Sequence, residues 1–305
     1  MTEKTPLVSI IVNCFNGEKY LRESLESILK QSYKNWEVIF WDNQSTDSSA
    51  KIFKSYNDKR FIYFYATKHT SLYKARNLAI EKSKGDFLSF LDVDDFWGKD
   101  KLETQMPYFN SLKVGVVFSN LWVMKKNKST KKIYTNSKLP SGRIFNELIN
   151  NYNIGILTTV IRKDFFLQLK KKFDERFSII GDFDLFLRLS KLCEFVSIQE
   201  PLAFYRLHAQ NLSTLNKEKE VKEYEIWINE NQLTLNQFQM KKIKTKVNYR
   251  KFVNFKIDGN YKECISMIVS FKVNFLNIKN LIILFSPIVL LRKILWYHQN
   301  YNDLN

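Results

Sequence analysis

Three carboxylates within four residues follow an apolar run in the first third of the chain. Residues 87–91 suit a buried strand, and Asp92, Asp94 and Asp95 come directly after it. Carboxylates packed together repel one another, so donors, water or a cation must compensate them. Oxygen ligands favour Mg²⁺ or Mn²⁺, which usually also bind substrate phosphates. The pattern suggests a metal-dependent enzyme acting on a diphosphate, whereas plain turn or cap aspartates would need no metal.

Alternating strands and helices are predicted to position this acidic cluster. Such an order predicts an α/β fold with a mostly parallel sheet and helices on both faces. Ligands of these sheets gather beyond the carboxyl ends of the strands, where polar residues follow three of the predicted strands. No GxGxxG follows the first strand, which argues against a dinucleotide-binding dehydrogenase. The apolar spacing predicts strands at 7–12, 37–41, 61–65 and 87–91, and helices at 18–31, at 71–83 and from Ser45 or Asp47 to about 56.

The remaining sequence predicts a mixed middle part and a helical C-terminal region. We expect one domain over residues 1–215 and a helical region over 216–305. Residues 281–291 are apolar with basic flanks, and the run is well short of the roughly 20 residues that span a bilayer. This favours a helix near 278–298 lying in the membrane surface, with a buried helix as the alternative. The spacing predicts strands at 115–123, 157–161, 195–198 and 202–205, and helices at 182–192, 218–238, 241–257 and 261–271, the last two separated by Gly259.

The composition narrows the range of binding partners that we expect. Lys and Arg number 48 against 31 Asp and Glu, giving a formal net charge of +17. This charge favours nucleotides or an anionic membrane, although a general richness in Lys would also produce it. The charge is spread along the chain without base-stacking motifs, so no nucleic-acid partner is expected. Three dispersed cysteines and a short polar N-terminus predict a cytoplasmic protein, peripheral on the inner face of the cytoplasmic membrane.

Five segments in order resemble family 2 glycosyltransferases, over roughly residues 7–215. The resemblance implies a GT-A fold (Rossmann-like) and transfer of sugar from a nucleotide-sugar donor. The segments are residues 8–16 (VSIIVNCFN, against VSIIIPTYN), 41–49 (WDNQSTDSS, against DDGSTDxS), 75–95 (ARN, GDF and LDVDD, against ARNxG, GD(F/Y) and LDADD), 181–188 (GDFDLFLR, against EDxDLxLR) and 205–208 (YRLH, against YRxH).

The resemblance implies a donor site at the strand ends. Asp42 would accept a hydrogen bond from the nucleotide base, and Asn16 would line the nucleoside; a turn or cap is the alternative for Asp42. Asp94 would bind Mn²⁺ or Mg²⁺, and Asp92 would meet the ribose or a metal-bound water. His208 would be a further metal or phosphate ligand, unless it is structural. UDP is favoured, with dTDP as the alternative because both bases present the same N3–H.

The acceptor side is implied by the GDFDLFLR segment. Asp182 is the candidate general base of an inverting transfer, or else only caps its helix. Asp184 is the alternative base and would otherwise contact substrate or pair with Arg188. Arg76 would pair with Asp92 or the diphosphate, since a guanidinium suits both, or form an ordinary buried ion pair.

Several departures from the family pattern keep other functions open. The second aspartate and the glycine of DDGS are Asn43 and Gln44, and the glutamate before the base is Gly181. The leading hypothesis is an inverting, metal-dependent hexosyl- or N-acetylhexosaminyl-transferase that adds one sugar to a lipid-linked or lipopolysaccharide-type glycan. A degenerate nucleotide- or glycan-binding module is the alternative. A sugar nucleotidyltransferase is less favoured, because residues 13–18 lack its Gly-rich loop.

Overall fold

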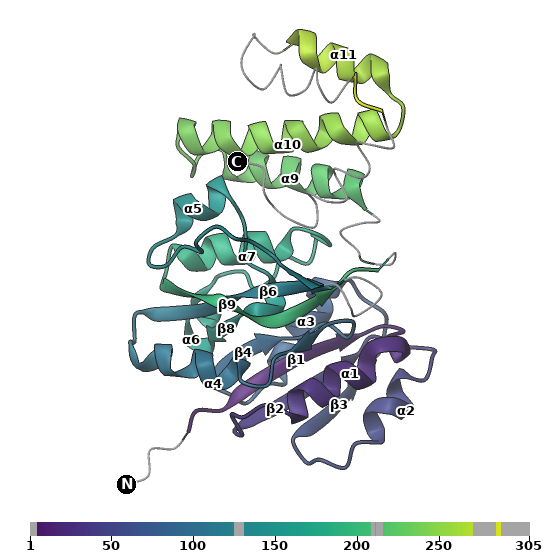
Figure 1. The fold of residues 1–305 in the computed structure, drawn as a ribbon, viewed down its shortest axis with the longest axis vertical. Coiled ribbons are helices and arrows are strands. Elements are labelled where there is room, and N and C mark those ends of the chain that lie inside the picture. Colours follow the sequence, from purple (N-terminus) through teal and green to yellow (C-terminus); the bar gives the residue numbers. More distant parts are fainter. Residues whose placement is uncertain (1–4, 125–130, 209–210, 212–215, 271–284, 288–305) are drawn as a thin grey trace. The chain divides into compact units, whose positions relative to one another are not determined.

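The computed structural model describes residues 5–124, 131–208, 211, 216–270 and 285–287 (Figure 1). The chain divides into two compact units, one of Met1–Leu148 with Tyr152–His208 and one of Ile149–Asn151 with Ala209–Asn305. The surface helix predicted near 278–298 lies outside the described residues, apart from 285–287. Across the described ranges, no helix is both long enough and apolar enough to cross a bilayer.

The first unit opens with the predicted parallel strands. They lie in the order β3-β2-β1-β4, and α3 contacts β1 and β2. The helix for which Ser45 or Asp47 was the predicted cap begins at Ser49, and the Asp47 carboxylate accepts hydrogen bonds from the Ser49 and Glu18 amides, both at 2.9 Å. The elements are β1 (Val8–Cys14), α1 (Glu18–Leu29), β2 (Trp36–Asp42), α2 (Ser49–Lys54), β3 (Phe61–Tyr65), α3 (Leu72–Glu81) and β4 (Phe87–Phe90).

The sheet continues with strands of both directions, in the order β8-β6-β9-β5, and β7 pairs with β6. The predicted acidic cluster follows β4, which belongs to the parallel part of this mixed sheet. The additional strands therefore leave the expected position of the cluster unchanged. The elements are β5 (Phe96–Trp97), α4 (Lys101–Gln105), a 3₁₀ turn (Met106–Asn110), β6 (Val114–Met124), β7 (Lys131–Ile133), α5 (Phe145–Asn150), a 3₁₀ turn (Ile156–Thr158), β8 (Val160–Arg162), α6 (Lys163–Gln168), α7 (Gly181–Ser190) and β9 (Glu194–Arg206).

Two strand predictions in this part were wrong. The segment 157–161 begins as a 3₁₀ turn and becomes a strand only at Val160. The segments 195–198 and 202–205 form one strand, β9, which runs through Pro201. A proline cannot donate to a ladder, and the pairing with β6 shifts register on either side of Asn120, the residue opposite Pro201.

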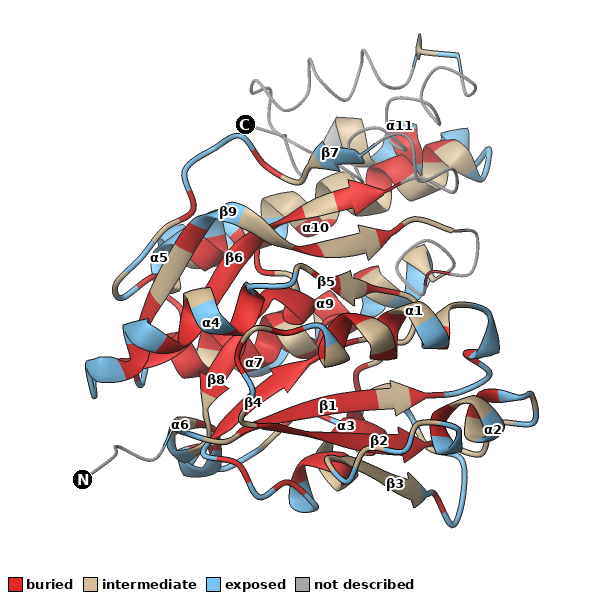
Figure 2. Ribbon diagram, turned by 60° about the horizontal axis from the view of Figure 1, so that its bottom comes forward, coloured by how far each residue is buried: buried red, intermediate tan, exposed pale blue. Residues whose placement is uncertain are grey.

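The core lies on the faces of the parallel strands, where alternate side chains of a strand pack on the same side of the sheet. Every residue of β2 is buried, whereas β3, at the end of the strand order, is half-buried (Figure 2). The side chains of β1 that point to one face share a core cluster with the apolar stripe of α1. These buried elements fix the positions at which the strand ends present polar side chains. The shared cluster includes Val8, Ile10, Val12, Leu21, Leu25 and Ile28.

The second unit is helical, with α9 (Lys217–Asn231), α10 (Gln237–Ile257) and α11 (Tyr261–Ser270). The single helix predicted over 218–238 was wrong, because the chain ends α9 at Asn231 and restarts at Gln237. A capping box starts α10: the Asn236 side chain accepts from the Gln239 amide at 2.9 Å, and the Gln239 side chain accepts from the Asn236 amide at 3.0 Å. Gly259, at φ +78°, follows α10 as predicted.

Candidate active site

Parallel pairing brings the predicted polar clusters to one edge of the sheet. Cys14, at the end of β1, is the register partner of Asp42, at the end of β2. On the other side of β1, Ile11 pairs with Phe90, and the Leu91 amide donates to the Ile11 carbonyl at 3.1 Å. Asp92 therefore follows β4 at the same edge, as the sequence predicts for a site at the carboxyl ends of strands.

Asp42 is fully buried and held on both carboxylate oxygens. Oδ1 accepts from the Ser45 amide at 2.7 Å, and Oδ2 accepts from the Tyr63 hydroxyl at 2.7 Å. Burial and the hydrogen bond to Asp42 raise the pKa of Tyr63, so this hydroxyl stays a donor. The Asx-type turn considered for Asp42 is thus present, but each oxygen has a second lone pair that can accept from a base.

The loop after β1 and the loop after β2 each contain a residue with strained backbone. Asn16 has φ +54° and Gln44 has φ +69°, in the left-handed region that favours glycine. The Asn16 side chain accepts from the Thr46 amide at 2.8 Å. The Gln44 side chain donates to the Thr67 carbonyl at 3.1 Å and accepts from the His69 amide at 3.0 Å. The strain explains why the family pattern has glycine where this chain has Gln44.

The three aspartates after β4 have three different partners. Asp92 accepts from Arg76 at 2.7 Å, so one of the pairings predicted for Arg76 is present; the Arg76 side chain is nearly buried. Asp94 Oδ2 lies 2.7 Å from His208 Nε2. Asp95 is buried and accepts from the Arg206 amide at 2.8 Å. Burial, with Asp94 and Asp92 adding to it, raises the pKa of Asp95 well above its usual range. Asp95 thus anchors the end of β9, while Asp92 and Asp94 stay partly exposed.

These residues fit a metal held jointly by protein and substrate. Asp94 and His208 offer an oxygen and a nitrogen side by side, and their side chains are 25% and 12% exposed. Within the ranges described above, no group of three or more His, Cys, Asp or Glu side chains is arranged to hold a metal ion. Mg²⁺ and Mn²⁺ sites of this class take one or two protein carboxylates, and substrate phosphates complete the coordination. The donor set fits that arrangement.

Asp182, the candidate base, is the second residue of α7. Its Oδ1 accepts from the Phe183 amide at 2.9 Å. Burial raises the pKa of Asp182, while the charge of Arg76, the Phe183 amide and the Tyr152 hydroxyl lower it. A carboxylate whose pKa is raised is a stronger base than one at the usual value. Because Arg76 also contacts Asp92, one side chain connects the acidic cluster with the candidate base.

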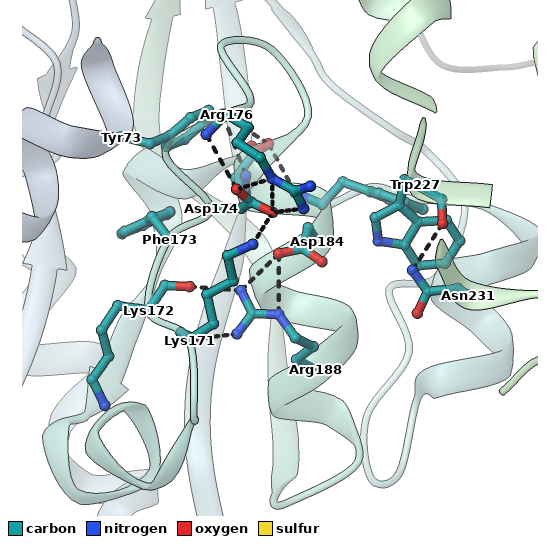
Figure 3. A network of polar contacts seen from close by, with 12 residues as sticks. Tyr73, Lys171, Lys172, Phe173, Asp174, Arg176, Asp184, Arg188, Trp227 and Asn231 are labelled. Atoms are coloured by element: carbon teal, nitrogen blue, oxygen red, sulfur yellow. Dashed lines mark hydrogen bonds and ion pairs between the residues drawn. The ribbon is translucent and has the colours of Figure 1, made fainter. Parts of the chain in front are cut away.

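Asp184 and Arg188 pair with each other, as one sequence alternative expected. Arg188 donates to Asp184 Oδ2 at 2.7 Å and to the Lys172 carbonyl at 2.7 Å. In the same network Asp174 accepts from Arg176 at 2.7 Å and from Lys171 at 2.5 Å (Figure 3). These contacts anchor the loop that leads into α7. Whether Asp184 and Arg188 also contact substrate stays a prediction.

Two residues of α3 that hold this loop had no role in the sequence prediction. Asn77 donates to the Phe173 carbonyl at 3.0 Å and accepts from the Phe173 amide at 3.1 Å. The Tyr73 hydroxyl accepts from the Asp182 amide at 3.3 Å. Asn77 belongs to the ARN segment, which contributed to the family resemblance, but Asn77 was assigned no role from the sequence. Tyr73 precedes Arg76 by three residues, a spacing that puts both on one helix face.

Comparison with known proteins agrees with the predicted family and fold. The family model described as "Glycosyl transferase family 2" matches residues 9–183. The chain is 31% identical to the putative teichuronic acid biosynthesis glycosyltransferase TuaG of Bacillus subtilis (strain 168) over 166 residues, 54% of this chain and 65% of TuaG. It is 30% identical over 223 residues, 71% of this chain and 83% of the relative, to a protein of Escherichia coli named UDP-Glc:alpha-D-GlcNAc-diphosphoundecaprenol beta-1,3-glucosyltransferase WfgD.

Solved structures share the fold at low sequence identity. TarS 1–349 of S. aureus, in complex with UDP-GlcNAc, has a TM-score of 0.66 at 18% identity, covering 82% of this chain and 75% of TarS 1–349. The mannosyltransferase PcManGT of Pyrobaculum calidifontis, in complex with GDP-Man and Mn²⁺, has a TM-score of 0.62 at 12% identity, covering 98% and 86% of the two chains. The predicted GT-A-type fold is confirmed.

Proposed function

Because this chain belongs to glycosyl transferase family 2, we propose that it transfers one sugar, with inversion, from a nucleotide diphosphate sugar to a glycan hydroxyl. The observation that carries the proposal is the position of Arg76. Its guanidinium contacts Asp92 of the acidic cluster at 2.7 Å, and its charge lowers the pKa of Asp182. A donor diphosphate near the acidic cluster and an acceptor near Asp182 would thus both lie close to Arg76 of α3.

UDP is the favoured nucleotide of the donor, with dTDP as the alternative. Asp42 is a buried acceptor at a strand end, fixed by Ser45 and Tyr63, and such an acceptor suits a base N3–H. The names of WfgD and of the TarS complexes include UDP-Glc, UDP-GlcNAc and UDP, which supports the same choice. Asn16 would border the nucleoside, because its side chain bonds Thr46 in the loop that follows Asp42.

The acidic cluster would serve the leaving diphosphate. Asp94 and His208, with Asp92 nearby, would hold Mn²⁺ or Mg²⁺; when bound, such an ion supplies charge stabilisation for the departing diphosphate. Arg76 holds Asp92 in place and adds positive charge to the same region. PcManGT is in complex with GDP-Man and Mn²⁺, which supports the choice of ion.

Asp182 would take the proton of the acceptor hydroxyl as that oxygen attacks the anomeric carbon. The attack comes from the face opposite the diphosphate, so a single carboxylate is enough and the configuration inverts. The raised pKa of Asp182 makes it a better proton acceptor, and the Arg76 charge keeps enough of it ionised. Asp184 is less suited to this task, because Arg188 already neutralises it.

The acceptor would be a lipid-linked or lipopolysaccharide-type glycan, reached by peripheral attachment to the inner face of the membrane. The name of WfgD includes a diphosphoundecaprenol-linked sugar, and TuaG is named for teichuronic acid biosynthesis. The net charge of +17 would draw the chain to an anionic membrane surface.

A thermal-shift screen with UDP, dTDP, GDP and their common sugars, with and without Mn²⁺, tests the donor site. A ligand at one hundred times its Kd stabilises the folded state by about 2.7 kcal/mol. We expect a shift with UDP that grows with Mn²⁺, and we expect Asp94→Asn to lose the growth. A folded protein that responds to no nucleotide would move the binding-module alternative to first place. Release of pyrophosphate from UTP and a sugar phosphate would instead identify a nucleotidyltransferase.

A further inference from the structure

Gly181, the residue before the candidate base, stands where a side chain has no room. A Cβ built on Gly181 would lie 2.6 Å from Cδ2 and Cζ of the Tyr73 ring, far inside van der Waals contact. The Tyr73 side chain is 3% exposed, and its ring stacks on Phe173 with centroids 5.3 Å apart. The ring therefore cannot move aside. The glutamate of the EDxDLxLR pattern is absent here because Tyr73 occupies its space.

The Tyr73 hydroxyl lies at the start of α7. The residue preceding this helix is Ile180, whose apolar side chain cannot accept a hydrogen bond from the first turn. Tyr73, from α3, accepts from the Asp182 amide at 3.3 Å instead, and it donates to the Ile179 carbonyl at 3.1 Å. Its oxygen is also 3.5 Å from Asp182 Oδ1. One hydroxyl thus fixes the backbone on both sides of the helix start and lies next to the reactive carboxylate.

The same face of α3 carries Arg76, three residues further on. The guanidinium carbon lies 5.5 Å from the centre of the Tyr73 ring, and the guanidinium contacts Asp92. The position of Asp182 is therefore tied through Tyr73 to the helix that also holds the acidic cluster. A displacement of the acidic cluster would therefore be transmitted to Asp182 through α3, which carries both Arg76 and Tyr73.

We propose that Tyr73 is a positioning residue for Asp182, and that the pair Tyr73 and Gly181 replaces a side chain at position 181. This inference rests on the proposed function, in which Asp182 is the base. The groups facing Asp182 are Tyr73 and Arg76 from α3 and Tyr152, with Asp92 behind Arg76. Of these, Tyr73 contacts both the amide and the carboxylate of Asp182.

Tyr73→Phe removes the hydroxyl and keeps the ring. We expect kcat to fall about tenfold or more, since small misplacements of a base are costly, while the donor KM changes by less than about twofold. The acid limb of the kcat profile should move to higher pH, because the variant loses the hydroxyl hydrogen that the Ile179 carbonyl, at 3.1 Å, shares with Asp182 Oδ1, at 3.5 Å. Tyr33→Phe is the matched control: Tyr33 is also buried, and its hydroxyl bonds the Pro6 carbonyl at the opposite end of β1.

A double-mutant cycle tests the pair without relying on activity. Gly181→Glu alone should lower Tm strongly, and combining it with Tyr73→Ala should recover part of the loss, because the vacated space admits the carboxylate. Losses that simply add would overturn the pairing.

The two proposals fail in different ways. A wild-type protein that transfers sugar, together with a Tyr73→Phe variant of unchanged kcat and pH profile, would overturn the role of Tyr73 alone. A wild-type protein that binds UDP but transfers no sugar to any acceptor would overturn both.

Discussion

Two carboxylates two residues apart in α7 have different surroundings, and this difference supports the roles proposed for them. Asp184 is paired with Arg188, whereas Asp182 is bonded by backbone and hydroxyl groups. The guanidinium of Arg188 thus already engages the Asp184 carboxylate. The residue whose pKa burial raises is the better candidate for proton transfer.

Exchanging each carboxylate for its amide should separate these roles. Asp182→Asn should lower kcat about 10²- to 10⁴-fold and leave the UDP-induced thermal shift unchanged, because the donor site does not include it. Asp184→Asn should instead lower stability, since it leaves Arg188 without its charge partner. Initial rates and Tm of both variants give the comparison. Loss of transfer in Asp184→Asn with retention in Asp182→Asn would reverse the assignment.

The free-energy cost of the left-handed backbone at Gln44 can be measured by comparing two substitutions at this position. Gln44→Gly and Gln44→Ala both lose the side-chain bonds to the 67–69 segment, so their difference reports the backbone alone. At φ +69° the glycine variant should be more stable by about 1 kcal/mol. Urea unfolding of both variants measures this difference. Equal stabilities would mean that the loop relaxes away from this conformation.

The elements that carry the site were the part of the fold most open to prediction. β1, β2 and β4 are mostly apolar, and polar residues stand at or directly after their carboxyl ends; this pattern predicts both the buried strand and the polar edge of the sheet. β9 was predicted as two strands because the local signal of Pro201 is that of a break. Only its pairing with β6, which is far away in the sequence, lets the strand continue.

Side-chain partnerships between elements were harder to foresee. The approach of Tyr73 to Gly181 joins residues 108 positions apart by number, and no local pattern contains that distance. The capping box of α10 is a local signal of Asn236 and Gln239, but it was missed from the sequence, and one helix was predicted through this point. Roles assigned to Asp92 and Arg76 rested on motif spacing, and their predicted contact is present.

Helix α4 carries a lysine that its packing leaves desolvated. Lys101 is fully buried, and its amine donates to Ser89 Oγ at 3.2 Å and to the Thr159 carbonyl at 3.4 Å. Burial lowers the pKa of Lys101 well below its usual range. The unfolded chain therefore binds a proton that the folded protein resists, and this lysine makes stability rise with pH from the lowered pKa up to the unfolded value near 10.

Lys101→Met should therefore stabilise the protein at neutral pH, by about 1 kcal/mol or more. Ser89 Oγ would keep its own bond to the Thr159 carbonyl at 2.6 Å, so neither acceptor is left without a partner. The advantage of the variant should shrink as pH approaches 10, where the unfolded lysine also loses its proton. Urea unfolding at pH 7 and pH 10 checks both statements. A variant less stable than wild type at pH 7 would contradict the reasoning.

At the scale of the whole molecule, the net charge of +17 predicts a measurable preference for anionic membranes. The full chain should co-sediment with vesicles containing anionic phospholipid and much less with purely zwitterionic ones. Raising salt from about 0.1 M to 1 M shortens the screening length from about 10 Å to 3 Å and should release most of the bound protein. Equal binding to both vesicle types would argue against electrostatic attachment.

Two partners of the aspartates after β4 come late in the chain. The Asp95 carboxylate meets the Arg206 amide across 111 residues, and Asp94 meets His208 across 114. On the ribosome, the β1–β4 layer and its aspartates emerge well before these partners. Arg76 precedes these aspartates in the chain and is already available to pair with Asp92. Until β9 is synthesised and docked, however, Asp94 and Asp95 lack the partners that they have in the folded chain. The contacts of the acidic cluster are therefore completed only when translation has passed His208.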